Sequence, residues 1–216
     1  MHKLAEKETD PVKKAEKENI AKICAHVPMN PARNFQEALQ SVWFSMCVLA
    51  NDSTGYLISF GQMDNYLYPY YKQDIESGAL NDAQVLELIE CFFIKTNNIV
   101  FFTDIDTAHF FAGNAVFANI LTGGIDKYGN DATNELSYLL IDAQISVRCI
   151  QPAMCCKVSD VTCDKFRNKI LDLVEAGMGY PSIYNDKVAI KTCLQYGFSQ
   201  QDANEYITSG CEEIGR

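Results

Sequence analysis

The sequence predicts an α/β fold in which helices alternate with short strands. Two observations lead to this prediction. In several stretches, apolar residues recur at intervals of three and four, as they do along one face of a helix. Between these stretches lie short runs of apolar, cysteine and aromatic residues, which are typical of strands. With 216 residues, of which 48% are hydrophobic, the chain is long enough to bury a sizeable core, and its length indicates one domain or two.

The N-terminal half is expected to contain three long helices. Asp10 followed by Pro11 favours the start of the first, and Pro28 favours an end just before it. The second follows a turn at 30–34, and the third follows Asn81, a good N-cap. The expected apolar stripes are Ile20, Ile23, Cys24 and Val27, then Phe35, Ala38, Leu39, Val42, Trp43 and Met46, and finally Val85, Leu88, Ile89, Phe92 and Phe93. Because Leu86 and Ile94 add apolar groups on other faces, the third helix is expected to be buried between layers.

Two further segments of this half are less regular. A short strand is predicted at 56–60, and Pro69 is expected in the first turn of a helix or at a kink in a longer one. Segment 99–117 combines five phenylalanines with scattered polar residues. That composition suits the lining of a small-molecule pocket, and equally a buried loop.

The C-terminal half is expected to alternate strands with helices. Gly123 and Gly124 indicate a turn, and Asp131 is expected to cap the next helix. Strands are predicted over 151–158 and 180–185 with a helix between them, and Ser199 with Asp202 opens a short helix before a final strand. The expected core-facing residues are Leu136, Leu139, Leu140 and Ala143 in the first of these helices and Phe166, Ile170, Leu173 and Val174 in the second.

Charge and motif content exclude several classes of protein. A net charge of -10 without a basic patch argues against a surface for nucleic acid or anionic membrane. No G-x-G-x-x-G or Walker motif is present. The N-terminus has no apolar signal core, and no apolar run approaches the roughly 20 residues that a membrane span requires. We therefore expect a cytoplasmic protein.

The nine cysteines form no C-x-x-C pair and no Cys/His spacing of a zinc site, so no metal site is expected. An odd number without a secretion signal indicates free thiols in a reducing compartment. The adjacent Cys155 and Cys156 lie in a predicted strand, and we interpret them as packing residues.

The last eleven residues, Y-I-T-S-G-C-E-E-I-G-R, form the candidate site. If the backbone stays extended, Cys211 and Glu213 face one side and share a cavity, while Glu212 points away. Gly210 permits an unusual backbone conformation and leaves room for a substrate to approach the sulfur. The alternative is a turn with a buried cysteine and two solvated glutamates, and the pattern alone favours that alternative.

Five further stretches change that balance. They are E-T-D-P-V-K-K-A-E, N-P-A-R-N-F-Q-E-A-L-Q, G-Q-M-D-N-Y-L-Y-P-Y-Y-K-Q-D-I-E-S-G, G-G-I-D-K-Y-G-N-D-A-T-N-E-L-S-Y-L and G-Y-P-S-I-Y-N-D, followed by G-C-E-E. With them the chain resembles glycyl radical enzymes of the pyruvate formate-lyase family along nearly its whole length. The resemblance implies part of a ten-stranded β/α barrel around the active-site loop, in a helix-rich α/β fold. It also implies that 1–216 is a partial domain, lacking the family's N-terminal part and its C-terminal glycyl radical segment.

The same resemblance implies roles for three residues. Cys211 would relay a radical between the glycyl segment and a substrate carbon, and Glu213 would accept a substrate hydroxyl proton as the neighbouring C–O, C–N or C–S bond breaks. Phe117 matches an aromatic residue that lines the substrate cavity. Val116 stands where hydroxyproline dehydratases carry an acidic residue, which argues against that substrate. A single loop cysteine followed by Glu212 argues against the acyl transfer of pyruvate formate-lyase, which needs two adjacent cysteines.

The cofactor and partners are also implied by the resemblance. No cofactor is expected in this chain, since the glycyl radical would lie on the missing segment and be installed by a radical S-adenosylmethionine activating enzyme under anaerobic conditions. The expected partners are that activase, a small hydroxylated substrate that loses water, an amine or a sulfur group, and a second copy in a homodimer of the full-length enzyme.

Three alternatives stay open at this stage. The chain is a non-catalytic remnant or interaction protein, a pyruvate formate-lyase-like acyltransferase, or an enzyme in which Cys211 is an ordinary nucleophile with His109 as its base. Because the loop is close to the chain end, we also expect it to be frayed and the isolated polypeptide to be inactive.

Overall fold

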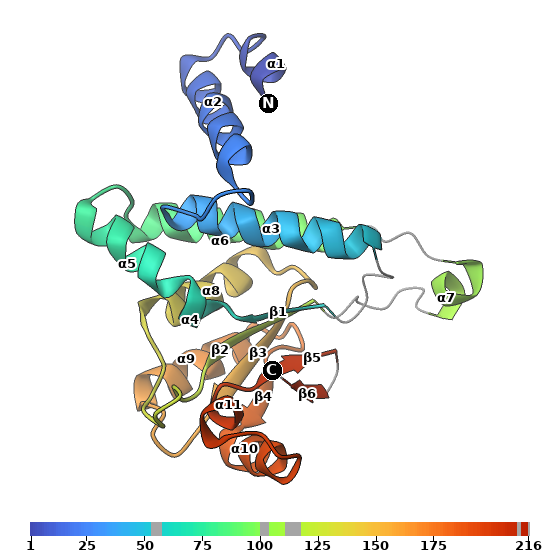
Figure 1. Cartoon of the computed structure of the whole chain (residues 1–216). Helices are drawn as coiled ribbons and strands as arrows, with labels where there is room; N and C mark the ends of the chain where they lie inside the picture. The colour runs from blue at the N-terminus through green and yellow to red at the C-terminus, as the bar shows by residue number, and fades with distance from the viewer. Residues whose placement is uncertain (53–57, 100–103, 111–117, 211–212, 216) are drawn as a thin grey trace.

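Four parallel strands, hydrogen-bonded in the order in which they occur along the chain, form the centre of the computed structural model (Figure 1). They are β1 (Ser59–Gln62), β2 (Asn119–Gly123), β3 (Ala153–Val158) and β4 (Ser182–Asn185). The structure describes residues 1–52, 58–99, 104–110, 118–210 and 213–215. Parallel neighbours in chain order, joined by helical crossovers, are the arrangement of a β/α barrel segment. The predicted fold class is therefore confirmed.

Eleven helices are present in the described residues. They are α1 (His2–Ala5), α2 (Pro11–His26), α3 (Phe35–Asp52), α4 (Met63–Tyr66), α5 (Tyr68–Ser77), α6 (Asp82–Asn97), α7 (Ile105–Phe110), α8 (Glu135–Val147), α9 (Asp164–Glu175), α10 (Asp186–Gln195) and α11 (Gln200–Asn204). A short antiparallel hairpin, β5 (Ile207–Ser209) and β6 (Glu213–Gly215), follows α11. None of the described helices has both the length and the apolar composition needed to cross a membrane.

The two faces of the sheet have different surroundings, because alternate residues of a strand point to opposite sides. Ile120, Met154 and Cys156 belong to the main core, which also contains apolar residues of α3, α6, α8 and α9. The alternate residues of β2 and β3 lie on the opposite face, and two of them, Asn119 and Lys157, make hydrogen bonds to residues 204–210. The second face is therefore the one that meets the hairpin.

Several predicted helix ends are confirmed. The Asp10 side chain accepts hydrogen bonds from the backbone N–H groups of Val12 and Lys13, and α2 ends at His26, two residues before Pro28. Asn81 caps α6 in a capping box with Gln84. Pro69 lies in the first turn of α5.

Other expectations about the elements are wrong. Asn134, not Asp131, caps α8 and accepts from the Leu136 N–H, while Asp131 accepts from Thr133. The strand expected at 56–60 is found at Ser59–Gln62. Strand β2 was not predicted, because the glycine pair at its end suggested only a turn. Helix α10 was not predicted either. Of segment 99–117, residues 104–110 are exposed and include helix α7, so this part is not a buried loop, and residues 100–103 and 111–117 lie outside the described residues.

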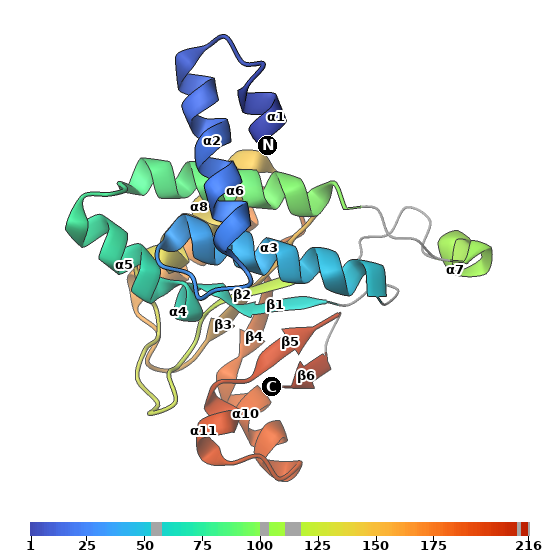
Figure 2. The ribbon, with the colours of Figure 1, turned by 45° about the horizontal axis from the view of Figure 1, so that its top comes forward.

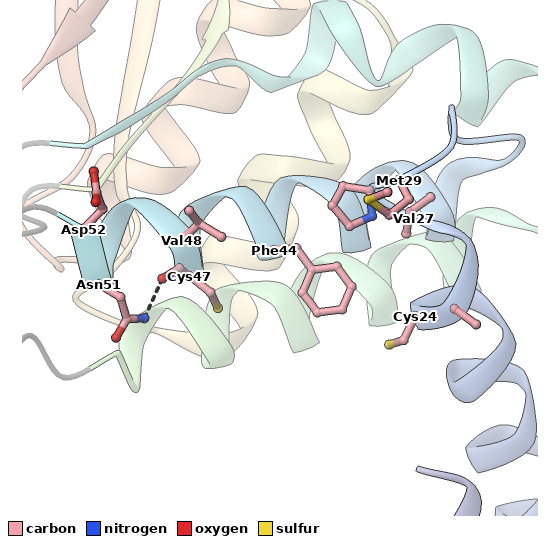
Figure 3. A pocket seen from close by; sticks show the side chains of 10 residues that line it. Cys24, Val27, Met29, Phe44, Cys47, Val48, Asn51 and Asp52 are labelled. Carbon is pink, nitrogen blue, oxygen red and sulfur yellow. Dashed lines mark hydrogen bonds between the residues drawn. The ribbon is translucent and has the colours of Figure 1, made fainter.

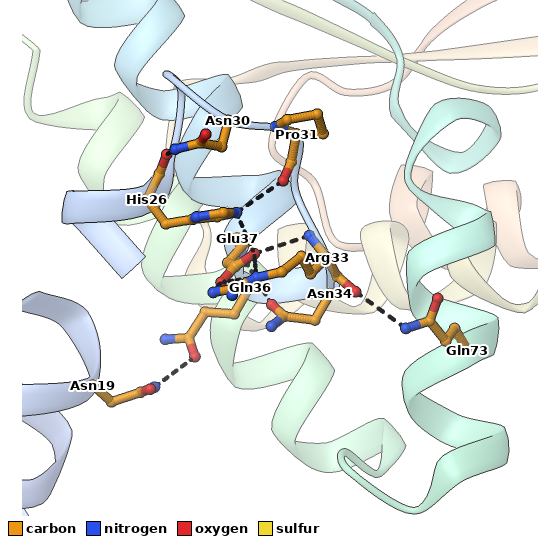
Figure 4. Close-up of polar contacts among 9 residues, drawn as sticks. All are labelled: Asn19, His26, Asn30, Pro31, Arg33, Asn34, Gln36, Glu37 and Gln73. Carbon is orange, nitrogen blue, oxygen red and sulfur yellow. Dashed lines mark hydrogen bonds and ion pairs between the residues drawn. The ribbon is translucent and has the colours of Figure 1, made fainter. Parts of the chain in front are cut away.

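The first two helices project from the rest of the molecule (Figures 1 and 2). An apolar groove between α2 and α3 is lined by residues that include Cys24, Met29, Phe44 and Val48 (Figure 3). Polar contacts also join the two helices: the Asn19 side-chain amide of α2 donates to Gln36 Oε1 of α3 at 3.1 Å, and His26 Nε2 of α2 lies 3.9 Å from a carboxylate oxygen of Glu37 on α3 (Figure 4). Glu37 is almost fully buried and also accepts from the guanidinium of Arg33 in the connecting loop. The junction between α2 and α3 is thus held by both apolar and charged contacts.

Candidate active site

The described ends of the G-C-E-E stretch belong to the β5–β6 hairpin, since Gly210 follows β5 and Glu213 begins β6. Ile207 pairs with Gly215, Thr208 with Ile214 and Ser209 with Glu213. Because the chain reverses between Ser209 and Glu213, it is not the extended strand from which a shared face for two residues was inferred. Cys211, Glu212 and Phe117 lie outside the described residues, and Glu213 lies on β6 with its side chain exposed. The shared cavity of Cys211 and Glu213 stays a prediction.

The hairpin lies against the face of the sheet opposite the main core, where β5 contacts β1 and β2 (Figure 2). The side-chain amide of Asn119, at the start of β2, donates a buried hydrogen bond of 2.8 Å to the Gly210 carbonyl oxygen. Gly210 is buried and has a φ of 60°, a left-handed conformation that glycine adopts at little cost. The residue immediately before Cys211 is thus tied to a central strand.

A second attachment comes from Lys157 on β3, whose side chain is fully buried. Its Nζ donates to the carbonyl oxygens of Asn204 and Tyr206, each at 3.2 Å. It also lies 4.1 Å from the centre of the Tyr206 ring, within the range of a cation–π contact. Burial lowers the pKa of Lys157, and the charge of Asp186 opposes that effect. The lysine therefore holds the segment that leads into β5.

Tyr206 anchors the same segment from the side of α10. Its hydroxyl donates a 2.8 Å hydrogen bond to Asp186, the first residue of α10. The ring is fully buried in a small core with Ala189, Cys193 and Ala203. Burial raises the pKa of the Tyr206 hydroxyl, so it stays protonated at neutral pH and remains a donor. Burial also raises the pKa of Asp186, against the opposing effect of Lys157.

Gly124 provides the space that this arrangement needs. A Cβ atom at this position would lie 2.7 Å from Lys157 Cε and 3.1 Å from an Asp186 carboxylate oxygen. Its φ of +80° is a conformation that side chains with a Cβ rarely adopt. The second glycine of the G-G pair is therefore more than a turn residue. Because it has no Cβ, it leaves room for the Lys157 side chain beside Asp186 of α10.

The two adjacent cysteines are packing residues, as predicted. Cys155 and Cys156 are both buried on β3 and face opposite sides of the sheet. Burial raises the pKa of Cys155 to about 11, with the Thr208 and Ser182 side chains acting in the opposite direction. Burial raises the pKa of Cys156 as well. Neither thiol is therefore ionised at neutral pH, and their positions on opposite faces do not form a joint site.

His109 does not support the nucleophile–base alternative. It lies on α7, where its side chain is exposed. Figures 1 and 2 both show α7 projecting away from the sheet, on a different part of the molecule from the β5–β6 hairpin. The arrangement brings no base from α7 to the hairpin.

Three residues at this site were not predicted, namely Lys157, Asn119 and Asp186, and Tyr206 was included only as a strand residue of the candidate stretch. One signal was available for the lysine, because a single charged residue within the apolar stretch Q-P-A-M-C-C-K-V has to find partners once the strand is buried. The others gave no such signal, since their partners lie 20 to 91 residues away in the chain.

The comparisons agree with one another. A family model described as pyruvate formate lyase-like matches residues 1–216. Isethionate sulfite-lyase of Oleidesulfovibrio alaskensis is 34% identical over 97% of this chain and 26% of its own length. A solved structure concerned with 1,2-propanediol dehydration in Roseburia inulinivorans has a TM-score of 0.95 and 38% identity, over 99% of this chain and 27% of that one. A glycyl radical enzyme from Archaeoglobus fulgidus has a TM-score of 0.93 and 34% identity, over 99% of this chain and 28% of its own. The chain thus spans about a quarter of the length of these relatives.

Proposed function

The chain belongs to the pyruvate formate lyase-like family, whose members similar to it are glycyl radical enzymes, and on this basis we propose that it carries the hydrogen-atom relay of a lyase or dehydratase. In this proposal Cys211 is the relay and Glu213 the proton acceptor, and Phe117 lines the substrate cavity. The observation that carries the proposal is the attachment of the hairpin: the two ends of the segment leading to Cys211 are bound, through Tyr206 and Gly210, to buried side chains of adjacent central strands.

Such attachment suits a radical relay. An unactivated C–H bond is not broken by a side-chain acid or base at neutral pH, so a radical is needed, and a thiol can pass one on. The sulfur has to approach the substrate carbon to within van der Waals distance, and an error of about 1 Å in position can cost about a hundredfold in rate. Buried hydrogen bonds that fix residues 206 and 210 to the sheet help to meet that requirement.

The proposed reaction is a sequence of hydrogen-atom and proton transfers. A glycyl radical on a segment outside these 216 residues takes the hydrogen atom of the Cys211 thiol. The resulting thiyl takes a hydrogen atom from a substrate carbon that bears a hydroxyl group. The Glu213 carboxylate accepts the hydroxyl proton while the bond from the neighbouring carbon to the leaving group breaks, and the leaving group departs with the electron pair of that bond. A hydroxide leaving group takes up the proton held by Glu213 and departs as water, whereas an amine or a sulfur group departs without it. The product radical then recovers a hydrogen atom from the Cys211 thiol, which regenerates the thiyl.

The substrate and partners are part of the same proposal. The names of the relatives refer to isethionate and to 1,2-propanediol, which are both small hydroxylated molecules. We therefore propose a small hydroxylated substrate that loses water, an amine or a sulfur group. The other proposed partners are a radical S-adenosylmethionine activase and a second copy of the chain, in a cytoplasmic enzyme. The 216 residues alone are proposed to be a partial, inactive domain.

A chimera tests the proposal. In it, these 216 residues replace the matching quarter of the Roseburia inulinivorans protein, and the product is activated anaerobically and assayed for dehydration of 1,2-propanediol. The expected result is a glycyl radical signal in the electron paramagnetic resonance spectrum of every variant, with turnover abolished by Cys211→Ser and by Glu213→Gln. Glu212→Gln is the matched control, because it changes the adjacent carboxylate, and it should retain turnover. Turnover in Cys211→Ser, or equal losses from the two glutamate variants, would contradict the proposal.

A further inference from the structure

Lys157 is a buried cation that the proposed chemical steps do not use. Its side chain is fully buried on β3, whose other described side chains are apolar or thiol groups. Removing an ammonium group from water is costly unless hydrogen bonds and opposite charges compensate. A strand position that needed only to fill space would be occupied more cheaply by an apolar residue. The hydrogen bonds and charges around the ammonium group should therefore show why this position is a lysine.

The ammonium group has three donors, and each has an acceptor within reach. Two acceptors are the carbonyl oxygens of Asn204 and Tyr206, at 3.2 Å. The third is Gln62 Oε1 on β1, at 3.5 Å, and the amide of Gln62 donates in turn to the Gly123 carbonyl at 2.7 Å. One side chain of β3 therefore connects the strand β1 with the chain between α11 and β5.

The charges around Lys157 support this geometry. Asp186 on α10, Asp64 on α4 and Glu205 after α11 each favour the ammonium form. Two neutral groups also face it, the Tyr206 hydroxyphenyl ring and the Cys193 thiol of α10. These carboxylates favour the ammonium form, whereas burial, which is the larger effect, lowers the pKa of Lys157.

Tyr206, whose carbonyl oxygen accepts from Lys157, directly precedes the first residue of β5. Gly210, whose carbonyl oxygen accepts from Asn119, directly follows the last residue of β5. We infer that Lys157 is a positioning residue for the proposed reaction: its ammonium group sets where β5 begins relative to the four-stranded sheet and, through β5, where Cys211 and Glu213 are presented. The positioning of β5 by Lys157 is inferred from the hydrogen bonds, and its importance for the reaction rests on the proposed function.

Hydrogen exchange of this 216-residue chain measures the role of Lys157 directly. Lys157→Met keeps a long unbranched side chain and removes the charge and the three donors. Cys156→Ala is the matched control, because the neighbouring residue is equally buried but its side chain points into the helix-covered core. We expect Lys157→Met to lower the protection of amides in β5 and β6 by about tenfold or more relative to those of β2 and β3. A uniform loss of protection across all four strands, like that expected of Cys156→Ala, would overturn the inference.

A pH titration of the unmodified chain gives a readout that a space-filling role would not produce. Burial lowers the pKa of Lys157, so the ammonium group should lose its proton below the usual lysine range, and hairpin protection should fall there. Burial raises the pKa values of Tyr206 and Cys193, so both groups lose their protons at a higher pH than usual. Hairpin protection that does not fall as the pH is raised to the usual lysine range, after correction for intrinsic exchange, would overturn the inference even if Lys157→Met fails to fold.

These measurements need neither substrate nor radical. The positioning role of Lys157 and the proposed function are therefore tested independently. If the hairpin depends on Lys157 but the Cys211→Ser chimera turns over, the proposed function falls and the attachment stands. If the chimera variants behave as expected while the hairpin does not respond to Lys157→Met, the positioning role alone falls.

Discussion

The Asn119 side-chain amide donates a 2.8 Å hydrogen bond to the Gly210 carbonyl oxygen, which joins a central strand to the residue just before Cys211. The two residues are 91 positions apart in the chain. This bond and the Lys157 contacts act on opposite ends of β5. Three predictions concern these contacts and their neighbours, and a fourth concerns the junction between α2 and α3.

Asn119→Asp should loosen the turn. The substitution keeps the shape of the side chain but replaces the donor with an acceptor that faces a carbonyl oxygen, inside a buried site. We expect a loss of about 2–4 kcal/mol in the free energy of unfolding, measured by urea denaturation, and faster alkylation of Cys211 measured by mass spectrometry. Asn65→Asp, at an exposed position on α4, is the control and should change neither quantity. Unchanged stability and alkylation in Asn119→Asp would show that the bond to Gly210 is unimportant.

Tyr206→Phe should destabilise the segment before β5. The change removes the donor to Asp186 and leaves a buried carboxylate without that hydrogen bond. The expected cost is about 1–3 kcal/mol in the free energy of unfolding. The pKa of Asp186, already raised by burial, should rise further. Tyr196→Phe, whose side chain is 81% exposed, is the control, and an equal effect of the two substitutions would count against the anchoring role of Tyr206.

Gly124→Ala and Gly129→Ala form a matched pair, since both glycines have left-handed backbone conformations, with φ of +80° and +90°. A Cβ at Gly129 meets nothing within 4 Å, so only the conformational cost of about 1–2 kcal/mol applies there. At Gly124 the Cβ would also collide with Lys157. Urea denaturation should therefore show a loss at Gly124→Ala that exceeds the loss at Gly129→Ala by about 1–3 kcal/mol. Equal losses would mean that Lys157 does not occupy the space beside Gly124.

The junction between α2 and α3 should weaken in acid. The hydrogen bonds from Arg33 lower the pKa of Glu37 in the folded state, although burial opposes this (Figure 4). Since the folded pKa lies below the unfolded value of about 4.3, the contribution of Glu37 to stability is present above that pH and is lost as the pH falls through the folded pKa. Glu37→Gln should flatten this part of the curve of unfolding free energy against pH, whereas Glu76→Gln, at an exposed glutamate on α5, should leave it unchanged. Parallel curves for Glu37→Gln and the parent chain would contradict the assignment.

Helix ends were the part of the fold that could be predicted best, because the signal is local. Asp10 and Asn81 cap their helices through the backbone N–H groups two or three residues ahead. Local signals also compete: Asp131 and Asn134 are both good caps, and only the second is placed where the chain enters α8, with its amide bonded to the Asp64 carbonyl. That contact spans 70 residues and has no trace in the local pattern.

The site could be predicted only in part, for the same reason. The G-C-E-E stretch was identifiable from the sequence through its resemblance to a family, and the hairpin around it is present. The side chains that hold it were not identifiable, since Asn119, Lys157 and Asp186 reach the hairpin region only when β2, β3 and α10 are brought together. An extended chain through residues 209–213 was a reasonable expectation from composition, but pairing of Ser209 with Glu213 reverses the backbone there.

The central claim is that Cys211 passes hydrogen atoms rather than protons. Its most direct test uses the chimera with 1,2-propanediol that carries two deuterium atoms on the terminal carbinol carbon. If the thiol returns the atom that the thiyl removed, the aldehyde product should carry one deuterium on its carbonyl carbon and one on the adjacent carbon, as read by mass spectrometry and NMR. Loss of the second deuterium entirely to solvent, or the same product from Cys211→Ser, would contradict the account.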